Sequence, residues 1–172
     1  MNKNSKNFPT LITERLTLRK LSINDAVAIL QLRSDEEINK FLGRKPSKTL
    51  EDALNFIKII LDNDTFYWPI TKTGDEKLIG TIGLFDFASD MKKCEIGYEL
   101  RTEFQGQAIM IEAATKVIRY AIDTLGVKNI DASTHKDNHS STKLLQKLNF
   151  KKLESIDPEN PNLFLFRLFE KN

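Results

Sequence analysis

Apolar and polar positions alternate in several stretches of the chain and predict β-strands there. Residues 15–21 alternate leucines with charged or hydroxyl side chains, a pattern typical of a half-buried strand. Residues 65–71 and 77–87 are rich in aromatic and β-branched side chains and flank a turn-forming Gly-Asp-Glu sequence at 74–76, which predicts a hairpin. Gly80, inside the second of these stretches, indicates a bulge or a close approach of another backbone.

Elsewhere the apolar positions recur every three or four residues and predict amphipathic helices. Two of these helices begin with a hydroxyl residue that is followed three positions later by an acidic one, Ser22 with Asp25 and Thr49 with Asp52. Such pairs are typical of a capping box, in which each side chain accepts a hydrogen bond from the other residue's main-chain N–H. The second helix is expected to run to about Asn63.

The longest helical pattern spans residues 106–125 and predicts a helix with one face packed on a sheet. Gly126 follows it, and glycine is the usual residue just after a helix C-terminus. A shorter helix is expected to begin at the N-cap Asn138 and to end before Asn149, because asparagine tolerates a left-handed conformation. The remaining strands are expected at 91–100, 128–134, 150–156 and 162–169.

This order of elements predicts one α/β (α+β) domain, with helices on both faces of a mixed, mostly antiparallel sheet of about seven strands. A length of 172 residues is usual for one domain. Residues 1–10 are polar and are expected to be a flexible N-terminus, and residues 11–172 are expected to form the domain.

Composition narrows the functional classes. The 26 basic and 24 acidic residues nearly balance, and basic residues cluster only in pairs, so no nucleic-acid partner is expected. No apolar run approaches the ~20 residues that cross a membrane, and the N-terminal segment lacks a signal-peptide core, so no membrane association is expected. The single cysteine, Cys94, allows no intramolecular disulfide, which fits a cytoplasmic location.

The segment 102–108 enters the long helix through small residues, Gly106 and Ala108. The first N–H groups of a helix have no partner within the helix, and the helix dipole attracts negative charge to them. Small side chains at these two positions would let a phosphate touch the backbone. The same sequence also fits an ordinary strand-to-helix turn that contains a glycine.

Residues 103–108, Glu-Phe-Gln-Gly-Gln-Ala, resemble the pyrophosphate loop of the GNAT superfamily of acyl-CoA-dependent N-acyltransferases, which reads (Gln/Arg)-x-x-Gly-x-(Gly/Ala). The blocks at 95–100 and 138–150 are similar to those of the branch that acetylates ribosomal-protein N-termini (RimJ/RimL-like). The order of the blocks also agrees, and the resemblance covers nearly the whole chain after residue 10. The chain departs from the pattern in having Glu103 for Gln or Arg, Ala108-Ile109 for Gly-Tyr, and Asn149 for Gly.

The resemblance implies that acetyl-CoA is the cosubstrate, that a sheet splayed at its centre receives its pantetheine arm, and that no metal takes part. The implied cofactor-binding residues are the main-chain groups of Tyr98, Leu100 and Arg101, the loop residues Gln105, Gly106, Gln107, Ala108 and Ile109, and the pair Asn138 and Ser141. A capping role for Asn138 and Ser141, as N-cap and N3 of the shorter helix, explains that pair equally well.

A protonated amine is not a nucleophile, so the implied reaction needs a group that removes its proton. Glu95 and Glu99 lie on one face of their strand, and either is a candidate base, although both also fit a solvent-exposed face. Many members of the superfamily place a tyrosine where this chain has Leu145. Ser141 or Tyr98 could protonate the leaving thiolate instead, or the thiolate could leave unassisted, since its pKa is near ~8.5.

The resemblance thus implies an acetyltransferase whose acceptor is an amine, either a protein N-terminus or a small molecule, and homodimers are common among such proteins. A catalytically weak CoA-binding sensor or partner module of the same fold is the alternative.

His135 and His139 lack the glutamate of the zinc-protease signature, so no metal site is expected. Cys94 reads as a buried apolar residue and not as a nucleophile.

Overall fold

Eight strands form one sheet in residues 7–171, which are the residues that the computed structural model describes. The sheet has the order β1-β2-β3-β4-β5-β6-β8-β7, and every neighbouring pair in it is antiparallel except β5 and β6. The strands are β1 (Leu11–Ile12), β2 (Leu16–Leu18), β3 (Phe66–Lys72), β4 (Gly80–Phe85), β5 (Lys93–Leu100), β6 (Asn129–His135), β7 (Lys151–Lys152) and β8 (Leu163–Phe169).

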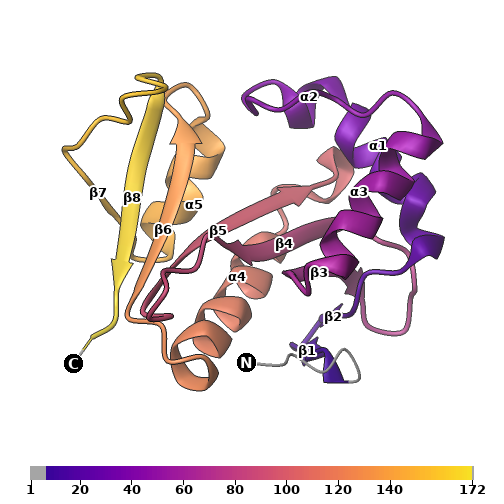
Figure 1. Cartoon of the computed structure of the whole chain (residues 1–172), viewed down its shortest axis with the longest axis horizontal. Coiled ribbons are helices and arrows are strands. Elements are labelled where there is room, and N and C mark those ends of the chain that lie inside the picture. The colour runs from indigo at the N-terminus through magenta and orange to yellow at the C-terminus, as the bar shows by residue number, and fades with distance from the viewer. Residues whose placement is uncertain (1–6, 172) are drawn as a thin grey trace.

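Helices cover both faces of this sheet, as the sequence predicts (Figure 1). The α-helices are α1 (Ala26–Ser34), α2 (Glu36–Asn39), α3 (Leu50–Asp62), α4 (Ile109–Arg119) and α5 (His139–Lys147). Short helical turns precede α1 and α4, at η2 (Ile23–Asp25) and η3 (Thr102–Phe104), and a π-helical turn, η4 (Tyr120–Thr124), extends α4. The predicted mixed α/β architecture is therefore confirmed.

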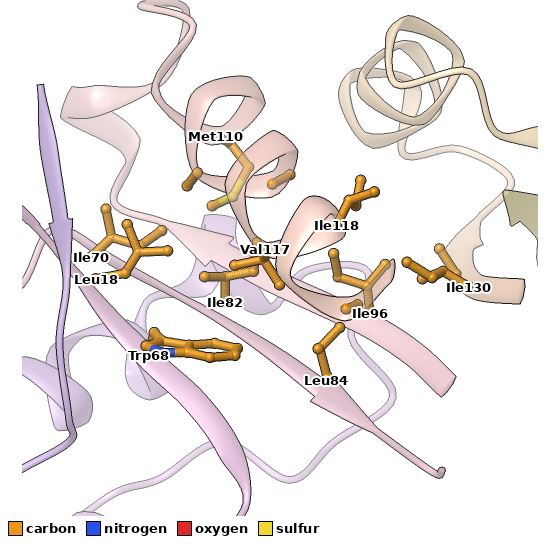
Figure 2. Close-up of a cluster of buried hydrophobic side chains, with 14 of the residues drawn as sticks. Leu18, Trp68, Ile70, Ile82, Leu84, Ile96, Met110, Val117, Ile118 and Ile130 are labelled. Carbon is orange, nitrogen blue, oxygen red and sulfur yellow. The ribbon is translucent and has the colours of Figure 1, made fainter. Parts of the chain in front are cut away.

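The two faces carry separate hydrophobic cores. On one face α4 packs on the central strands, and Figure 2 shows its Met110, Val117 and Ile118 beside the sheet residues Ile82 and Ile96. On the other face α1 and α3 pack over β3 and the segment that leads into β4. Because successive residues of a strand point to opposite faces, the two cores share strands but not side chains.

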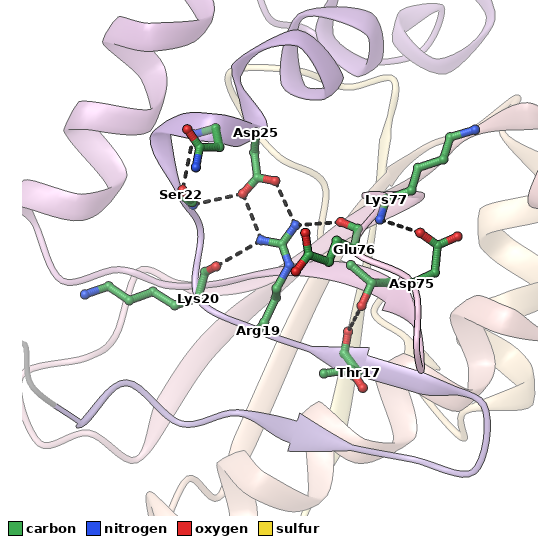
Figure 3. Close-up of polar contacts among 10 residues, drawn as sticks. Thr17, Arg19, Lys20, Ser22, Asp25, Asp75, Glu76 and Lys77 are labelled. Carbon is green, nitrogen blue, oxygen red and sulfur yellow. Dashed lines mark hydrogen bonds and ion pairs between the residues drawn. The ribbon is translucent and has the colours of Figure 1, made fainter.

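Both predicted capping boxes are present. Thr49 and Asp52 bond to each other's main-chain N–H groups at the start of α3. Ser22 and Asp25 do the same at η2, and Asp25 also accepts two hydrogen bonds from Arg19, at 2.9 and 2.8 Å (Figure 3). Arg19 in turn donates to the carbonyl of Glu76, at 3.0 Å, so this cap ties the start of α1 to the β3–β4 connection.

Three differences from the predicted elements bear on the fold and the site. The helix expected from residue 106 begins at Ile109, because Ala108 adopts a left-handed conformation with φ 59°. The strand expected at 150–156 is reduced to the two residues of β7, and β1 is an eighth strand that the pattern did not predict. Residues 1–6 of the N-terminus expected to be flexible lie outside the described residues, whereas Phe8 at its end packs on Trp68, with ring centroids 5.6 Å apart.

Candidate active site

The parallel strands β5 and β6 separate after three paired positions. Their last paired residues are Glu95 and Asp131. Beyond this point β5 stays paired with β4 as far as Leu100, and β6 stays paired with β8 as far as His135, so the two halves of the sheet diverge (Figure 1). The sheet is therefore splayed at its centre, as expected.

Alternate residues of β5 direct their main-chain groups into this gap. The N–H of Arg101 donates to the carbonyl of Ile79, on the β4 side, at 2.9 Å. In an antiparallel pair the hydrogen-bonded residues alternate, so Glu99 also faces β4, whereas Tyr98 and Leu100 face the gap. The splay thus leaves main-chain groups of Tyr98 and Leu100 without a partner strand.

Two of the residues expected to bind the cofactor through their main chain, Arg101 and Leu100, form hydrogen bonds within the protein instead. The carbonyl of Arg101 accepts from the N–H of Phe104, at 2.9 Å, so both main-chain groups of Arg101 are engaged. The carbonyl of Leu100 accepts from the side-chain amide of Gln105, at 3.1 Å. Of the three expected residues, Tyr98 keeps its main-chain groups for a ligand on this edge, and Leu100 keeps its N–H.

The loop before α4 presents a row of main-chain N–H groups. Gly106 (φ 74°) and Ala108 (φ 59°) are both left-handed. Within the described residues, the N–H groups from Gly106 to Ile111 have no hydrogen-bond partner, and the first helical bond in α4 is that from Glu112 to the carbonyl of Ala108. Together with the helix dipole, these groups form a concave site suited to an anion.

Two of the expected loop residues take other roles. The N–H of Gln105 donates to the carbonyl of Thr102, at 3.2 Å. The carbonyl of Gln107 accepts from Arg15, at 3.1 Å, and its side-chain amide donates to the carbonyl of Glu103, at 3.1 Å, so only its main-chain N–H is left for a ligand.

The gap and the loop open into one cleft of about 690 Å³. Its walls come from β5, β6, the start of β8, the loop before α4, the first turn of α4, one side of α5, and the segment around α2. The expected site residues in these walls are Tyr98, Glu99, Leu100, Gln105, Gly106, Ala108, Ile109, Asn138 and Ser141. The residues Glu95, Arg101 and Gln107 are not among the wall residues.

A hydrogen bond joins the two sides of this cleft. The hydroxyl oxygens of Tyr98, on β5, and Ser141, on α5, lie 2.9 Å apart. Burial raises the pKa of Tyr98 to about 12, so its hydroxyl stays protonated at neutral pH. Asn138 caps α5 by accepting from the N–H of Ser141, at 3.3 Å. Leu145, one turn further along α5, is buried in the core and has no polar role.

The two candidate bases lie in different surroundings. Glu99 lines the cleft and forms an ion pair with Arg44, and its second oxygen is buried without a hydrogen-bond partner. Glu95 lies outside the cleft wall, where its carboxylate accepts from the hydroxyl of Ser133, at 3.3 Å. Burial raises the pKa of Glu95, and the nearby carboxylates Asp86 and Asp131 act in the same direction.

The sequence prediction missed the contribution of the segment after α2. Phe41 stacks on His135, with ring centroids 5.2 Å apart and 25° between the ring planes, and both residues line the cleft. Arg44, from the same segment, contacts Glu99. No periodicity marks these positions, because each contact joins residues that are far apart in the sequence.

His135, the last residue of β6, makes its contacts within the protein. In the described part of the chain, no group of three or more His, Cys, Asp or Glu side chains could hold a metal ion. The Nδ1 atom of His135 instead accepts from the N–H of Asp137, at 3.1 Å.

Among residues 7–171, no helix is both long enough and apolar enough to span a membrane.

Solved structures share this architecture. A GNAT-family acetyltransferase from Bacillus anthracis has a TM-score of 0.81 at 20% identity and covers 94% of this chain and 98% of its own. The ribosomal-protein-S5-alanine acetyltransferase from Vibrio fischeri has a TM-score of 0.75 at 22% identity, with 94% and 96% covered. At these identities the likeness shows the fold alone.

Sequence comparisons identify the family. A model described as an acetyltransferase (GNAT) domain matches residues 15–151. The uncharacterized N-acetyltransferase YoaA of Bacillus subtilis (strain 168) is 33% identical over 149 residues, which are 84% of each chain. The uncharacterized N-acetyltransferase p20 of Bacillus licheniformis is 33% identical over 147 residues, 83% of each chain. This chain is therefore a member of the GNAT family of acetyltransferases.

Proposed function

We propose that this enzyme transfers an acetyl group from acetyl-CoA to a primary amine in the cytoplasm. The observation that carries the proposal is that the splay between β5 and β6 and the unpartnered N–H groups from Gly106 to Ile111 open into the same cleft. An acyl-CoA has an anionic diphosphate joined to an extended amide-containing arm. One cleft with an anion site at one end and a free strand edge along it fits both parts.

Different residues of the cleft would bind the diphosphate and the pantetheine arm. The N–H groups of the loop and of the first turn of α4 would hold the diphosphate, since helix N-termini favour phosphate. Tyr98 and Leu100 would pair with the amides of the pantetheine arm through their main-chain groups, as a neighbouring strand would do. Acetyl-CoA supplies a thioester whose carbonyl carbon an amine can attack.

Glu99 is the proposed proton acceptor for the amine, because it lines the cleft and Glu95 does not. The amine nitrogen then forms a bond to the carbonyl carbon, and the carbon–sulfur bond breaks. Ser141 is the proposed proton donor to the sulfur, and Tyr98, whose hydroxyl oxygen lies 2.9 Å from that of Ser141, would donate to Ser141 in turn. This pair would take the role that a tyrosine at the position of Leu145 has in many related proteins.

The acceptor amine is the open part of the proposal. One solved structure of the same fold is a ribosomal-protein-S5-alanine acetyltransferase, which supports a protein N-terminus as one candidate. A small-molecule amine is the other. The presence of Leu145 in place of a tyrosine favours a second reading, a CoA-binding module of the same fold with weak catalysis.

Two measurements test the proposal on the purified protein. Calorimetric titration with CoA, with ATP as the control, measures whether the cleft prefers the coenzyme. Release of free thiol from acetyl-CoA over a panel of amines and N-terminal peptides then measures turnover. Sustained amine-dependent release supports the enzyme, CoA binding without release supports the module, and equal affinity for CoA and ATP would contradict both.

A further inference from the structure

Arg15, in the connection between β1 and β2, bridges the loop before α4 and α4 itself. Its guanidinium donates through Nη1 to the carbonyl of Gln107, at 3.1 Å, and through Nε to the carboxylate of Glu112, at 2.7 Å. Gln107 belongs to the loop, and Glu112 belongs to the first turn of the helix. One side chain from a distant part of the sequence thus contacts the main chain of the proposed anion site.

Glu112 holds the guanidinium of Arg15 in this position. The carboxylate of Glu112 also accepts from the hydroxyl of Thr13, at 2.6 Å, and from the main-chain N–H of Arg15, at 2.8 Å. Partial burial acts to raise the pKa of Glu112, but the hydrogen bonds from Thr13 and Arg15 outweigh it and lower that pKa. Glu112 is therefore ionised at neutral pH, and its charge balances that of Arg15.

The peptide bond between Gln107 and Ala108 connects this contact to the cleft. In a trans peptide the C=O and the N–H point in opposite directions. Because the carbonyl of Gln107 points toward Arg15, the N–H of Ala108 points away from it. Ala108 lines the cleft, whereas Arg15, Gln107 and Glu112 do not. In the described part of the chain the N–H of Ala108 has no hydrogen-bond partner, so this orientation leaves it for a ligand.

Ala108 does not favour this orientation of the peptide. Its φ of 59° is left-handed, a conformation that the Cβ of an L-residue disfavours. A half-turn of the peptide between Gln107 and Ala108 would bring φ to about −120°, which is an allowed value. That half-turn would also exchange the directions of the Gln107 carbonyl and the Ala108 N–H, and it would break the hydrogen bond from Arg15. The bond from Arg15 therefore opposes a relaxation that alanine favours.

We propose that Arg15 is a positioning residue of the diphosphate site, whose hydrogen bond to Gln107 keeps the N–H of Ala108 available to the ligand. The inference rests on the proposed function, in which this loop binds the diphosphate of CoA. Arg15 acts through the peptide and not as a charge beside the ligand, since Glu112 balances its charge and neither side chain lines the cleft. Without Arg15, only the molecules that keep the peptide in its present orientation bind CoA, and the Kd rises in inverse proportion to their fraction.

Arg15→Met should raise the Kd for CoA about ten-fold, the scale on which alanine disfavours the left-handed conformation. In an Ala108→Gly background the same change should raise the Kd at most about three-fold, because glycine adopts either orientation readily. Calorimetric titration with CoA of the wild type, both single variants and the double variant measures the two ratios. If Arg15 attracted the diphosphate by its charge, or only stabilised the fold, the loss would be the same in both backgrounds.

Arg167→Met is the matched control and should leave the Kd for CoA nearly unchanged. Arg167, on β8, also donates through Nε to a carboxylate of another element, that of Asp131 at 2.6 Å, but it lies outside the cleft wall. Urea unfolding checks that each variant is folded. If Arg15→Met is not, Glu112→Gln replaces it in the same set of four proteins, because it removes the ion pair that orients the guanidinium.

The possible results separate this inference from the proposed function. An unchanged Kd in Arg15→Met, an equal loss in both backgrounds, or a similar loss in Arg167→Met would overturn the inference and leave the proposed function standing. A wild-type protein that does not bind CoA would overturn both.

Discussion

Tyr98 and Ser141 bring their hydroxyl oxygens within 2.9 Å of each other, although one lies on β5 and the other on α5. The bond therefore joins the two sides of the cleft next to the strand edge that is proposed to hold the pantetheine arm. Asn138 fixes the start of α5 beneath it. The two hydroxyls are thus held in place within the protein itself, which is the arrangement that the proposed proton donor requires.

Ser141→Ala should lower kcat about ten-fold and leave the Kd for CoA nearly unchanged. This loss is below the ~10²–10⁴ of a strong general acid, because a thiolate is a tolerable leaving group. Tyr98→Phe should lower kcat less, since Ser141 remains. Stopped-flow or steady-state thiol release measures both variants. Wild-type kcat in both would show that the thiolate leaves unassisted.

Gly106→Val should weaken CoA binding at least about ten-fold. The branched side chain is strained at φ 74° and would cover the N–H groups that are proposed to hold the diphosphate. Gly74→Val is the matched control, because Gly74 has φ 88° and open space around it but lies in the turn before β4. Calorimetric titration measures the Kd for CoA of both variants. Equal Kd values for Gly106→Val and Gly74→Val would contradict the loop assignment.

Glu99→Gln should lower kcat by about 10²-fold near neutral pH, because the amine then loses its proton acceptor. Glu95→Gln should change kcat by less than about three-fold, since Glu95 is not in the wall of the cleft. Both kcat values are measured from pH 6 to 9, together with the Kd for CoA. A larger loss in Glu95→Gln would reverse the assignment, and no loss in either would leave water as the base.

Glu95→Gln should also change how stability depends on pH. Burial raises the pKa of Glu95 above its ordinary value of 4.5, so the folded protein favours the protonated acid. That contribution to stability is present below the ordinary value and is lost as the pH rises through the folded-state pKa. The glutamine variant should therefore gain stability relative to wild type as the pH rises from 4 to 7. Urea unfolding at several pH values measures the difference, and a difference independent of pH would contradict the shift.

Features that depend on residues close together in the sequence, such as helix caps, were predicted correctly. The two capping boxes were predicted because a hydroxyl and a carboxylate three residues apart satisfy each other's N–H groups. Asn149 is left-handed, with φ 67°, as its place after a helix indicated. The order of apolar periods also predicted the mixed sheet and the two helical layers.

Contacts between distant segments could not be read in this way. The start of α4 moved to Ile109 because the backbone turns at Ala108, where alanine gives no signal for a left-handed conformation. Arg44 and Phe41 meet Glu99 and His135 only after the sheet has formed, so neither position carries a periodic or spacing signal. This part of the cleft wall therefore had to come from the structure.

Gly80→Ala should destabilise the protein by about 2 kcal/mol, within the ~1–3 kcal/mol that overpacking costs. A Cβ at this position would lie 2.5 Å from the carbonyl oxygen of Glu99 and 2.9 Å from the side chain of Leu100, so β4 and β5 would have to move apart. The close approach that the sequence indicated at Gly80 is thus a contact with the strand that borders the cleft. Gly97→Ala is the matched comparison on β5, because its Cβ would meet only the ring of Phe85, at 3.3 Å, and a ring can shift. Urea midpoints should fall clearly for Gly80→Ala and only slightly for Gly97→Ala, and equal midpoints would contradict the close packing of β4 on β5.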